Sequence, residues 1–323
     1  MKTAKKKTVR TISVIPFRIG VMESLRDEPR RKVWKEYDNY TMQNGQKVNL
    51  RQYILTFLES LPKGQGIKNI SGKNIGIQLD NTYAIQETES EIRCVIKTGS
   101  YGFSADLLNI ETNNVKKRDP ADCELIPFIC RFIFSKEHCV AILLVERFGQ
   151  YTATSGIFSA LEDYVNRTLP KECSLNMQWV TSPEYIKQNI RANVKAFRFI
   201  WHKIPSDIAD TLGQENETDR EGGMDLRVKA GIGKFWCLPN WFDWRKTNKA
   251  GIFIGGEDYD EMKVEMELDG RQRTVSVQKL DCFQMAFDIT DTIKLNTDGH
   301  PIPDSFYSAS EETLEVVKKA MSW

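Results

Sequence analysis

Apolar and polar residues alternate along much of the chain between Thr11 and Val145, the pattern of β-strands with one covered face. A first strand is expected from Thr11 to Val21, and β-rich sequence continues from Lys73 to Val145. Within that stretch, FICRFIF and CVAILLV are nearly continuous apolar runs separated by SKEH. Because such runs are typical of strands covered on both faces, we predict a hairpin at the centre of a sheet.

Helical spacing replaces the alternation in a few places. Asn49 is suited to cap a helix, and Pro62 and Gly64 close it; its apolar stripe is Leu50, Tyr53, Ile54, Phe57, Leu58 and Leu61. Before it, Asn44-Gly45 between short apolar segments indicates a hairpin turn. Further helices are predicted at 155–167, at 182–191 and from Glu311 to Met321, and Ser308 and Glu311 have the spacing of a capping box.

The element order predicts an α+β protein of two domains. The polar, glycine-containing segment 213–224 (GQENETDREGGM) is the expected linker. We therefore expect a β-rich mixed sheet with packed helices at 1–212, including an aromatic strand at 197–201. A smaller α+β domain is expected at 225–323, with strands near 225–236, 251–254, 262–268 and 272–280.

Composition narrows the class of protein. Hydrophobic residues make up 41% of the 323 residues, which suits a globular core. The 45 basic and 44 acidic residues give a net charge of +1, which excludes a uniformly basic nucleic-acid coat and leaves room for a local basic groove. The sequence has no apolar run long enough to span a membrane, and seven scattered cysteines without a C-x-x-C suit a reducing cytoplasm.

The sequence offers little for catalysis. The three histidines, His138, His202 and His300, lie far apart and have no metal ligand at a useful spacing. Nucleophile-elbow, zincin and Walker motifs are missing, and the lysine-flanked loop around Gly64 and Gly66 matches no phosphate cradle. We therefore expect a binding protein that is not an enzyme and uses neither a cofactor nor a metal.

One enzymatic alternative remains. Glu261 and Lys263 form an E-x-K at the start of a predicted strand, and metal-dependent nucleases place a carboxylate and a lysine in this way. Alternating Lys263, Glu265 and Glu267 are equally typical of the solvated face of a half-buried strand. Asp119, Asp122 and Glu124 fit a turn-rich loop better than a cation site.

Candidate nucleic-acid contacts are clusters of cations. Segment 235–244 holds five aromatics, which favour packing over base stacking, and the cations Arg245, Lys246 and Lys249 follow it. The predicted turn Asp269-Gly270 presents Arg271 and Arg273, which is either a phosphate-binding tip or an ordinary polar hairpin end. A flexible basic arm would carry Lys5, Lys6 and Lys7.

The chain resembles the RexA-like phage-exclusion proteins, DNA-binding sensors of two-component prophage defence systems. The resemblance lies in the order of four stretches. The fourth, KVEMELDGRQRTVSVQKL, stands at the place of that family's basic strand segment. It covers roughly residues 45–285, and residues 263–280 are less Lys-rich here than in the family. The first three stretches are VNLRQYILTFLESL with the strands after it, CRFIFSKEHCVAILLVERFGQYTATSGIFSALEDYV and LNMQWVTSPEYIKQNIRANVKAFRFIW.

The resemblance implies a two-domain homodimer that binds double-stranded DNA without sequence preference and works with a membrane-protein partner in antiviral defence or abortive infection. Our first hypothesis is therefore a cytoplasmic, non-enzymatic DNA-binding subunit whose affinity falls steeply with salt. The second is a metal-dependent nuclease using Glu261 and Lys263. The third is an interaction scaffold or sensor without affinity for DNA, which the near-neutral charge favours.

Overall fold

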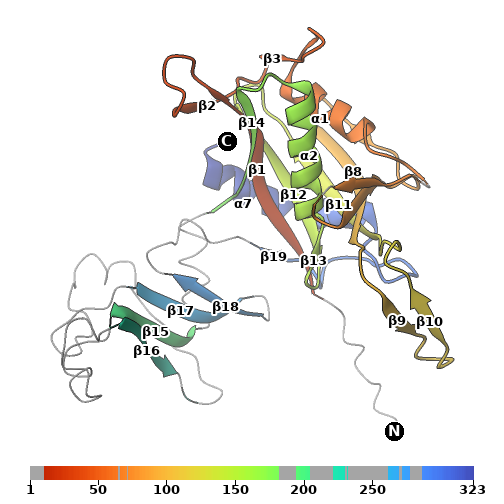
Figure 1. The fold of residues 1–323 in the computed structure, drawn as a ribbon, viewed down its shortest axis with the longest axis vertical. Helices are drawn as coiled ribbons and strands as arrows, with labels where there is room; N and C mark the ends of the chain where they lie inside the picture. The colour runs from red at the N-terminus through yellow and green to blue at the C-terminus, as the bar shows by residue number, and fades with distance from the viewer. Residues whose placement is uncertain are drawn as a thin grey trace. The chain divides into compact units, whose positions relative to one another are not determined.

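The computed structural model combines antiparallel sheets with four described helices, so the predicted α+β class is confirmed (Figure 1). The chain forms two compact units, Met1–Val180 with Ala286–Trp323 (the main unit) and Thr181–Met285 (the inserted unit). Among the described residues, no helix is long and apolar enough to cross a membrane. The structure describes residues 11–64, 66–70, 72–181, 194–203, 221–229, 231, 261–268, 271–276 and 286–323.

A large sheet forms the centre of the main unit. Its strands are, in spatial order, β14 (Cys173–Trp179), β1 (Ile12–Ser24), β12 (Ala141–Phe148), β11 (Ile126–Ile133), β8 (Glu91–Ser100), β6 (Ile75–Leu79) and β5 (Lys68–Ile70). At its margins lie β2 (Lys32–Trp34), β7 (Gln86–Glu87), β13 (Tyr151–Thr152) and β19 (Phe287–Asp288). The predicted hairpin β11–β12 lies at the centre and is buried on both faces, as its apolar runs required.

The pairing of this sheet differs from the mixed sheet that we expected. Every pairing between its named strands is antiparallel, and the described parallel contact is the isolated bridge between Lys63 and Leu79. Short connections such as the one between β11 and β12 allow only antiparallel neighbours, because a parallel pair needs a long crossover.

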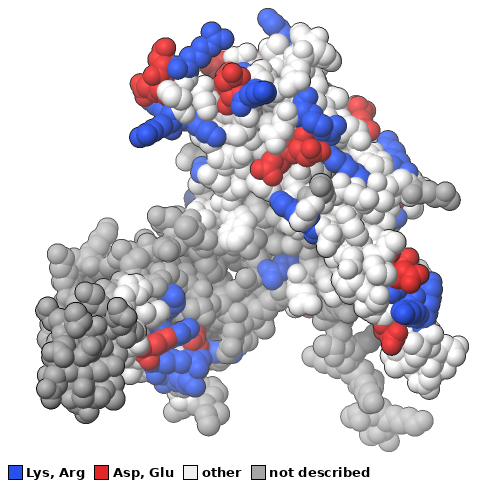
Figure 2. Space-filling view, in the orientation of Figure 1, with Lys and Arg blue, Asp and Glu red and all other residues white. Residues whose placement is uncertain are grey.

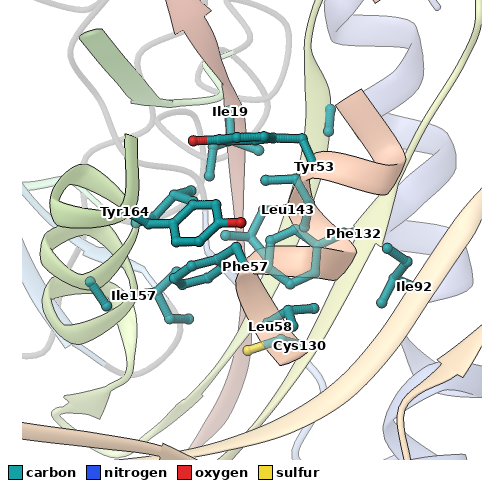
Figure 3. Packing of buried hydrophobic residues seen from close by; sticks show 14 of the residues in the cluster. Ile19, Tyr53, Phe57, Leu58, Ile92, Cys130, Phe132, Leu143, Ile157 and Tyr164 are labelled. Atoms are coloured by element: carbon teal, nitrogen blue, oxygen red, sulfur yellow. The ribbon is translucent and has the colours of Figure 1, made fainter. Parts of the chain in front are cut away.

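Two helices cover one face of the sheet. Helix α1 (Leu50–Glu59) begins with the predicted cap: the Gln52 amide donates to Asn49 Oδ1 at 2.8 Å, and the Asn49 amide donates to Gln52 Oε1 at 3.1 Å. Helix α2 (Thr154–Thr168) packs beside it, and the rings of Tyr53 and Phe57 lie 5.3 and 5.6 Å from that of Tyr164. Figure 3 shows these aromatics over the buried side chains of the sheet.

Helices α6 (Pro303–Ala309) and α7 (Glu311–Met321) lie on the opposite face of the sheet (Figure 1). The bounds of α7 agree with the prediction, but the predicted capping box is wrong. Ser308 belongs to α6, where its hydroxyl donates to the Asp304 carbonyl, and Ser310 occupies the N-cap position of α7. Ser310 makes no side-chain cap, because its hydroxyl donates to the Tyr307 carbonyl and accepts from Arg131 of β11.

Two small ribbons complete the main unit. The strands β3 (Tyr40–Thr41) and β4 (Lys47–Val48) form the predicted Asn44-Gly45 hairpin, and Gly45 takes the left-handed conformation that its turn needs, with φ of 83°. The strands β9 (Ala105–Leu108) and β10 (Val115–Arg118) form a separate two-stranded ribbon, which extends away from the large sheet in Figure 1.

The inserted unit contains a four-stranded antiparallel sheet in the order β16-β15-β17-β18. Its strands are β15 (Val194–Lys203), β16 (Glu221–Lys229), β17 (Glu261–Leu268) and β18 (Arg271–Ser276). The division between units differs from the expected one at 213–224. Strand β15 lies in the inserted unit, Glu221–Met224 are strand, and α6 and α7 return to the main unit, where they cover apolar residues of its sheet.

Candidate nucleic-acid interface

The sheet of the inserted unit has two unlike faces. Phe197, Phe199 and Trp201 alternate along β15, and the register places Val264 and Met262 beside the first two. All five side chains are buried. The alternate positions of the same strands carry charge, so the sheet is amphipathic in the way that period-two alternation predicts.

Three cations share one row of the charged face. Arg198 of β15 lies opposite Arg227 of β16 on one side and opposite Lys263 of β17 on the other. We call these three residues the cation row. Like charges placed directly opposite each other in a sheet repel, so such a row destabilises the fold unless other groups compensate.

Two carboxylates in the neighbouring rows compensate for this repulsion. Arg198 forms an ion pair with Asp225, in which Nε donates to Oδ1 at 3.2 Å, and Arg227 forms an ion pair with the buried Glu265. The hydrogen bond from Arg198 lowers the pKa of Asp225, which stays ionised. In Figure 2, blue and red side chains lie next to one another on the described part of this unit.

The row is accessible to a ligand. The side chains of Arg198 and Arg227 are 34% and 42% exposed, and Asp225 is exposed as well. The ion pair between Arg198 and Asp225 contributes little to stability at this exposure, because water and salt screen it. An anion with several oxygens can therefore take the place of Asp225 at small cost, and guanidinium groups bind phosphate in this geometry.

The structure places only some of the predicted DNA contacts. Arg271 and Arg273 lie in β18, opposite Leu268 and Met266 of β17, so both belong to the strand and not to the turn that precedes it. The predicted contacts Lys5, Lys6, Lys7, Arg245, Lys246 and Lys249 lie outside the described residues, as do the aromatic segment 235–244, Asp269-Gly270 and the helix predicted at 182–191.

The members of the cation row were not among our predicted DNA contacts. Arg198 lies in the expected aromatic strand FRFIW and Arg227 in DLRVK, and each occupies a polar position of an alternating pattern. That alternation was the available signal. It places each cation on the open face of its own strand, but it does not say which strands are neighbours or in which register.

The E-x-K residues occupy adjacent rows of the same sheet. Lys263 is in the cation row, whereas Glu261 lies opposite Ile200, and Asp225 lies opposite Ile200 on the other side. The backbones of Asp225 and Glu261 are thus two strand spacings apart, about 10 Å. Among the described residues no three His, Cys, Asp or Glu side chains form a group that could hold a metal.

The other candidate groups have structural partners. The Asp119 amide donates to Asp122 Oδ2, and Glu124 pairs with Arg118, as a turn-rich loop would use them. After α1, Lys68 of β5 pairs with Asp163, and Lys73, between β5 and β6, donates to the Ser159 hydroxyl. His138 stacks on Trp323 at 4.6 Å, His300 lies 5.3 Å from the Phe148 ring, and His202 is exposed on β15.

No protein-family model matches this chain, and no curated protein sequence matches it significantly.

Proposed function

We propose that this protein is a non-enzymatic, largely sequence-independent double-stranded DNA-binding subunit of a bacterial or prophage anti-phage defence system. The observation that carries the proposal is the cation row of Arg198, Arg227 and Lys263 on the charged face of the inserted sheet. Three cations in register repel one another and so lower the stability of the fold. A polyanion that contacts all three removes this repulsion when it binds. In this proposal the resemblance to the RexA-like proteins supplies the cytoplasmic setting, the homodimer and the membrane-protein partner.

Absence of sequence preference follows from the type of contact. Side chains from one face of a sheet can reach the phosphates of a duplex, and phosphate contacts fix the position of the protein without distinguishing the bases. In this proposal Arg271, Arg273, Arg245, Lys246 and Lys249 extend the contact beyond the row, and Lys5, Lys6 and Lys7 form an arm. Each phosphate neutralised releases counterions, so affinity must fall with salt.

The first test compares two double variants that lose the same charge. Arg198→Gln/Arg227→Gln removes two of the three cations of the row, whereas Arg26→Gln/Arg30→Gln removes two exposed arginines between β1 and β2 of the main unit. A mobility-shift titration with unrelated duplexes over a salt series should show affinity reduced about tenfold or more for the first variant. Its salt slope should fall by about 2, since each lost phosphate contact removes about 0.9.

The control variant should bind as the parent protein does. Equal losses in the two variants would show that only net charge matters and would contradict the proposed site. Parent protein that shifts no duplex at low salt would contradict DNA binding itself and favour the scaffold hypothesis. An Arg271→Ala/Arg273→Ala variant tests the predicted extension along β18 in the same titration.

The nuclease alternative keeps one supporting observation, because Glu261, Asp225 and Lys263 lie in neighbouring rows of one face. Against it, Asp225 is already engaged by Arg198. Plasmid DNA incubated with Mg²⁺ or Mn²⁺ should remain intact. Cleavage that disappears in Lys263→Ala would replace our proposal with the nuclease.

A further inference from the structure

The ribbon β9–β10 exposes an unusual amount of apolar surface. Ile110 at its tip is 90% exposed, and Leu107, Leu108 and Val115 are 51%, 56% and 61% exposed. In Figure 2 much of the end of this ribbon is white, although its turn also holds the exposed Glu111. A lone two-stranded ribbon is marginally stable in water, and exposed apolar surface of this kind marks an interaction site.

The base of the ribbon is held firmly although its tip is open. The buried Arg118 donates to the carbonyl oxygens of Ser100 and Asp122 and pairs with Glu124 at 3.5 Å. Its guanidinium also lies 4.4 Å from the centre of the Phe103 ring. The ribbon is therefore presented in a fixed place, which lowers the entropy lost when a partner binds.

Both outer edges of the ribbon lack a strand partner among the described residues, and their charges differ. Strand β10 carries Lys116, Lys117 and Arg118 in succession, so a second β10 alongside it would bring lysines together. Strand β9 has one charged residue, Asp106. Since like charges opposite each other are unfavourable, the edge of β9 is the one suited to a copy of itself.

We propose that two copies of this chain associate through β9, which pairs antiparallel with β9 of the second copy to form a four-stranded sheet from two ribbons. A two-fold axis perpendicular to the ribbon leaves the same face of both copies on the same side of the new sheet. Directly opposed residues must lie on one face, so the register has to place one residue of β9 opposite its own copy. Centring on Asp106 would oppose two carboxylates. Centring on Leu107 opposes two leucines and brings Leu108 opposite Asp106 of the second copy.

This register also agrees with the contacts within each ribbon. Lys116 lies opposite Leu107 in β10, so the two leucines would lie between two lysine stems that can cover them. On the other face, Val115 is opposite Leu108 and Lys117 is opposite Asp106. Each Asp106 would then remain beside its own Lys117. This interface gives a location to the homodimer of the proposed function. The number of copies, two, rests on that proposed function.

Cysteine cross-linking of the full chain tests the register. Opposed residues of antiparallel strands have Cα atoms about 4.5–5.5 Å apart, which a disulfide can span. Leu107→Cys should form a covalent dimer in mild oxidant, whereas the matched Val115→Cys, at least as exposed but on β10, should give only the background of the parent. No dimer from Leu107→Cys, or equal yields from both variants, would overturn the proposal.

Sedimentation equilibrium without DNA gives an independent readout. Leu107→Lys, which opposes two cations at the centre of the pairing, should weaken self-association at least about tenfold. Ile110→Lys removes the more exposed side chain outside the strand and should change it less than about twofold. A parent protein that stays monomeric would overturn this interface even if it binds DNA, and a dimer that binds no DNA would contradict only the function proposed above.

Discussion

The sheets of the main and inserted units both contain charged residues, and burial gives those charges opposite roles. In the main unit Arg131 of β11 is only 1% exposed and donates to Glu91, to the Tyr307 carbonyl, to Ser310 and to Glu311, at 2.6–3.0 Å. In the inserted unit Arg198 and Arg227 each have one carboxylate partner among the described residues, and both remain open to water. A buried cation surrounded by acceptors holds helices and strands together, whereas an exposed cation can exchange its carboxylate partner for a ligand.

Arg131 connects the C-terminal helices to the sheet. Its partners come from β8, from the end of α6 and from the start of α7, which are distant in sequence. Burial by itself would raise the pKa of Glu91, but hydrogen bonds from Arg93 and Arg131 outweigh it and lower that pKa. The carboxylate therefore stays charged within the interface and completes the network.

The largest expected effect is the loss of this network. Arg131→Met keeps the volume of the side chain but leaves Glu91 and the Ser310 hydroxyl without their shared donor, which should cost about 3–5 kcal/mol of unfolding free energy. Urea unfolding followed by circular dichroism measures the loss, and hydrogen exchange in α7 should rise with it. Arg198→Met is the matched control, because both members of its ion pair with Asp225 are exposed, and it should cost less than about 1 kcal/mol. Equal costs would contradict the distinction between the two sheets.

A buried carboxyl group in the main unit predicts a dependence of stability on pH. Glu146 of β12 is buried; its Oε2 accepts from the Ile129 amide at 3.0 Å, and its Oε1 has no hydrogen-bond partner among the described residues. Burial raises the pKa of Glu146 to about 8, which the hydrogen bond from Ile129 only partly opposes. The folded protein therefore keeps a proton that the unfolded chain loses near its ordinary pKa.

Stability should consequently fall as pH rises from about 5 to about 8, by up to about 1.4 kcal/mol per pH unit from this group. In Glu146→Gln that slope should disappear, since the amide has no proton to release, and the variant should be the more stable protein at pH 8. Unfolding free energies measured at several pH values test this. Glu312→Gln, exposed on α7, should keep the parent slope; an unchanged slope in Glu146→Gln would refute the prediction.

The smallest effect is expected where the function is proposed. Arg198→Gln removes one exposed ion pair, so the unfolding free energy should change by less than about 1 kcal/mol, and added salt should reduce even that. The same variant should lose affinity for duplex DNA. A large loss of stability would instead show that the cation row is structural, and reduced DNA binding would then have no bearing on the site.

Local features were predictable from the residues that form them. Helix α1 is where Asn49, the apolar stripe and Pro62 predict it, because the cap, the stripe and the stop all lie within fifteen residues. The β11–β12 hairpin and the Asn44-Gly45 turn were predictable for the same reason. The capping box at Ser308 was not, because Arg131, far away in sequence, binds the hydroxyl of Ser310 and fixes where α6 ends.

The candidate site was only partly predictable. Alternation places Arg198, Arg227 and Lys263 at polar positions of their strands, but their spacing of about thirty residues gives no sign that they share a row. The row arises from the order β16-β15-β17 and from the register of each pair, which hydrogen bonding and packing of the apolar face decide together.

The sequence by itself determined the α+β class, the places of several strands and helices, and the amphipathic alternation of each strand, since these follow from neighbours along the chain. Only the tertiary structure decided that residues 286–323 return to the main unit, that Arg131 is buried among four acceptors, and that three cations align on an open face. The physical reason is the same in each case: burial and strand register depend on contacts between distant segments, and periodicity within one segment does not specify its partner.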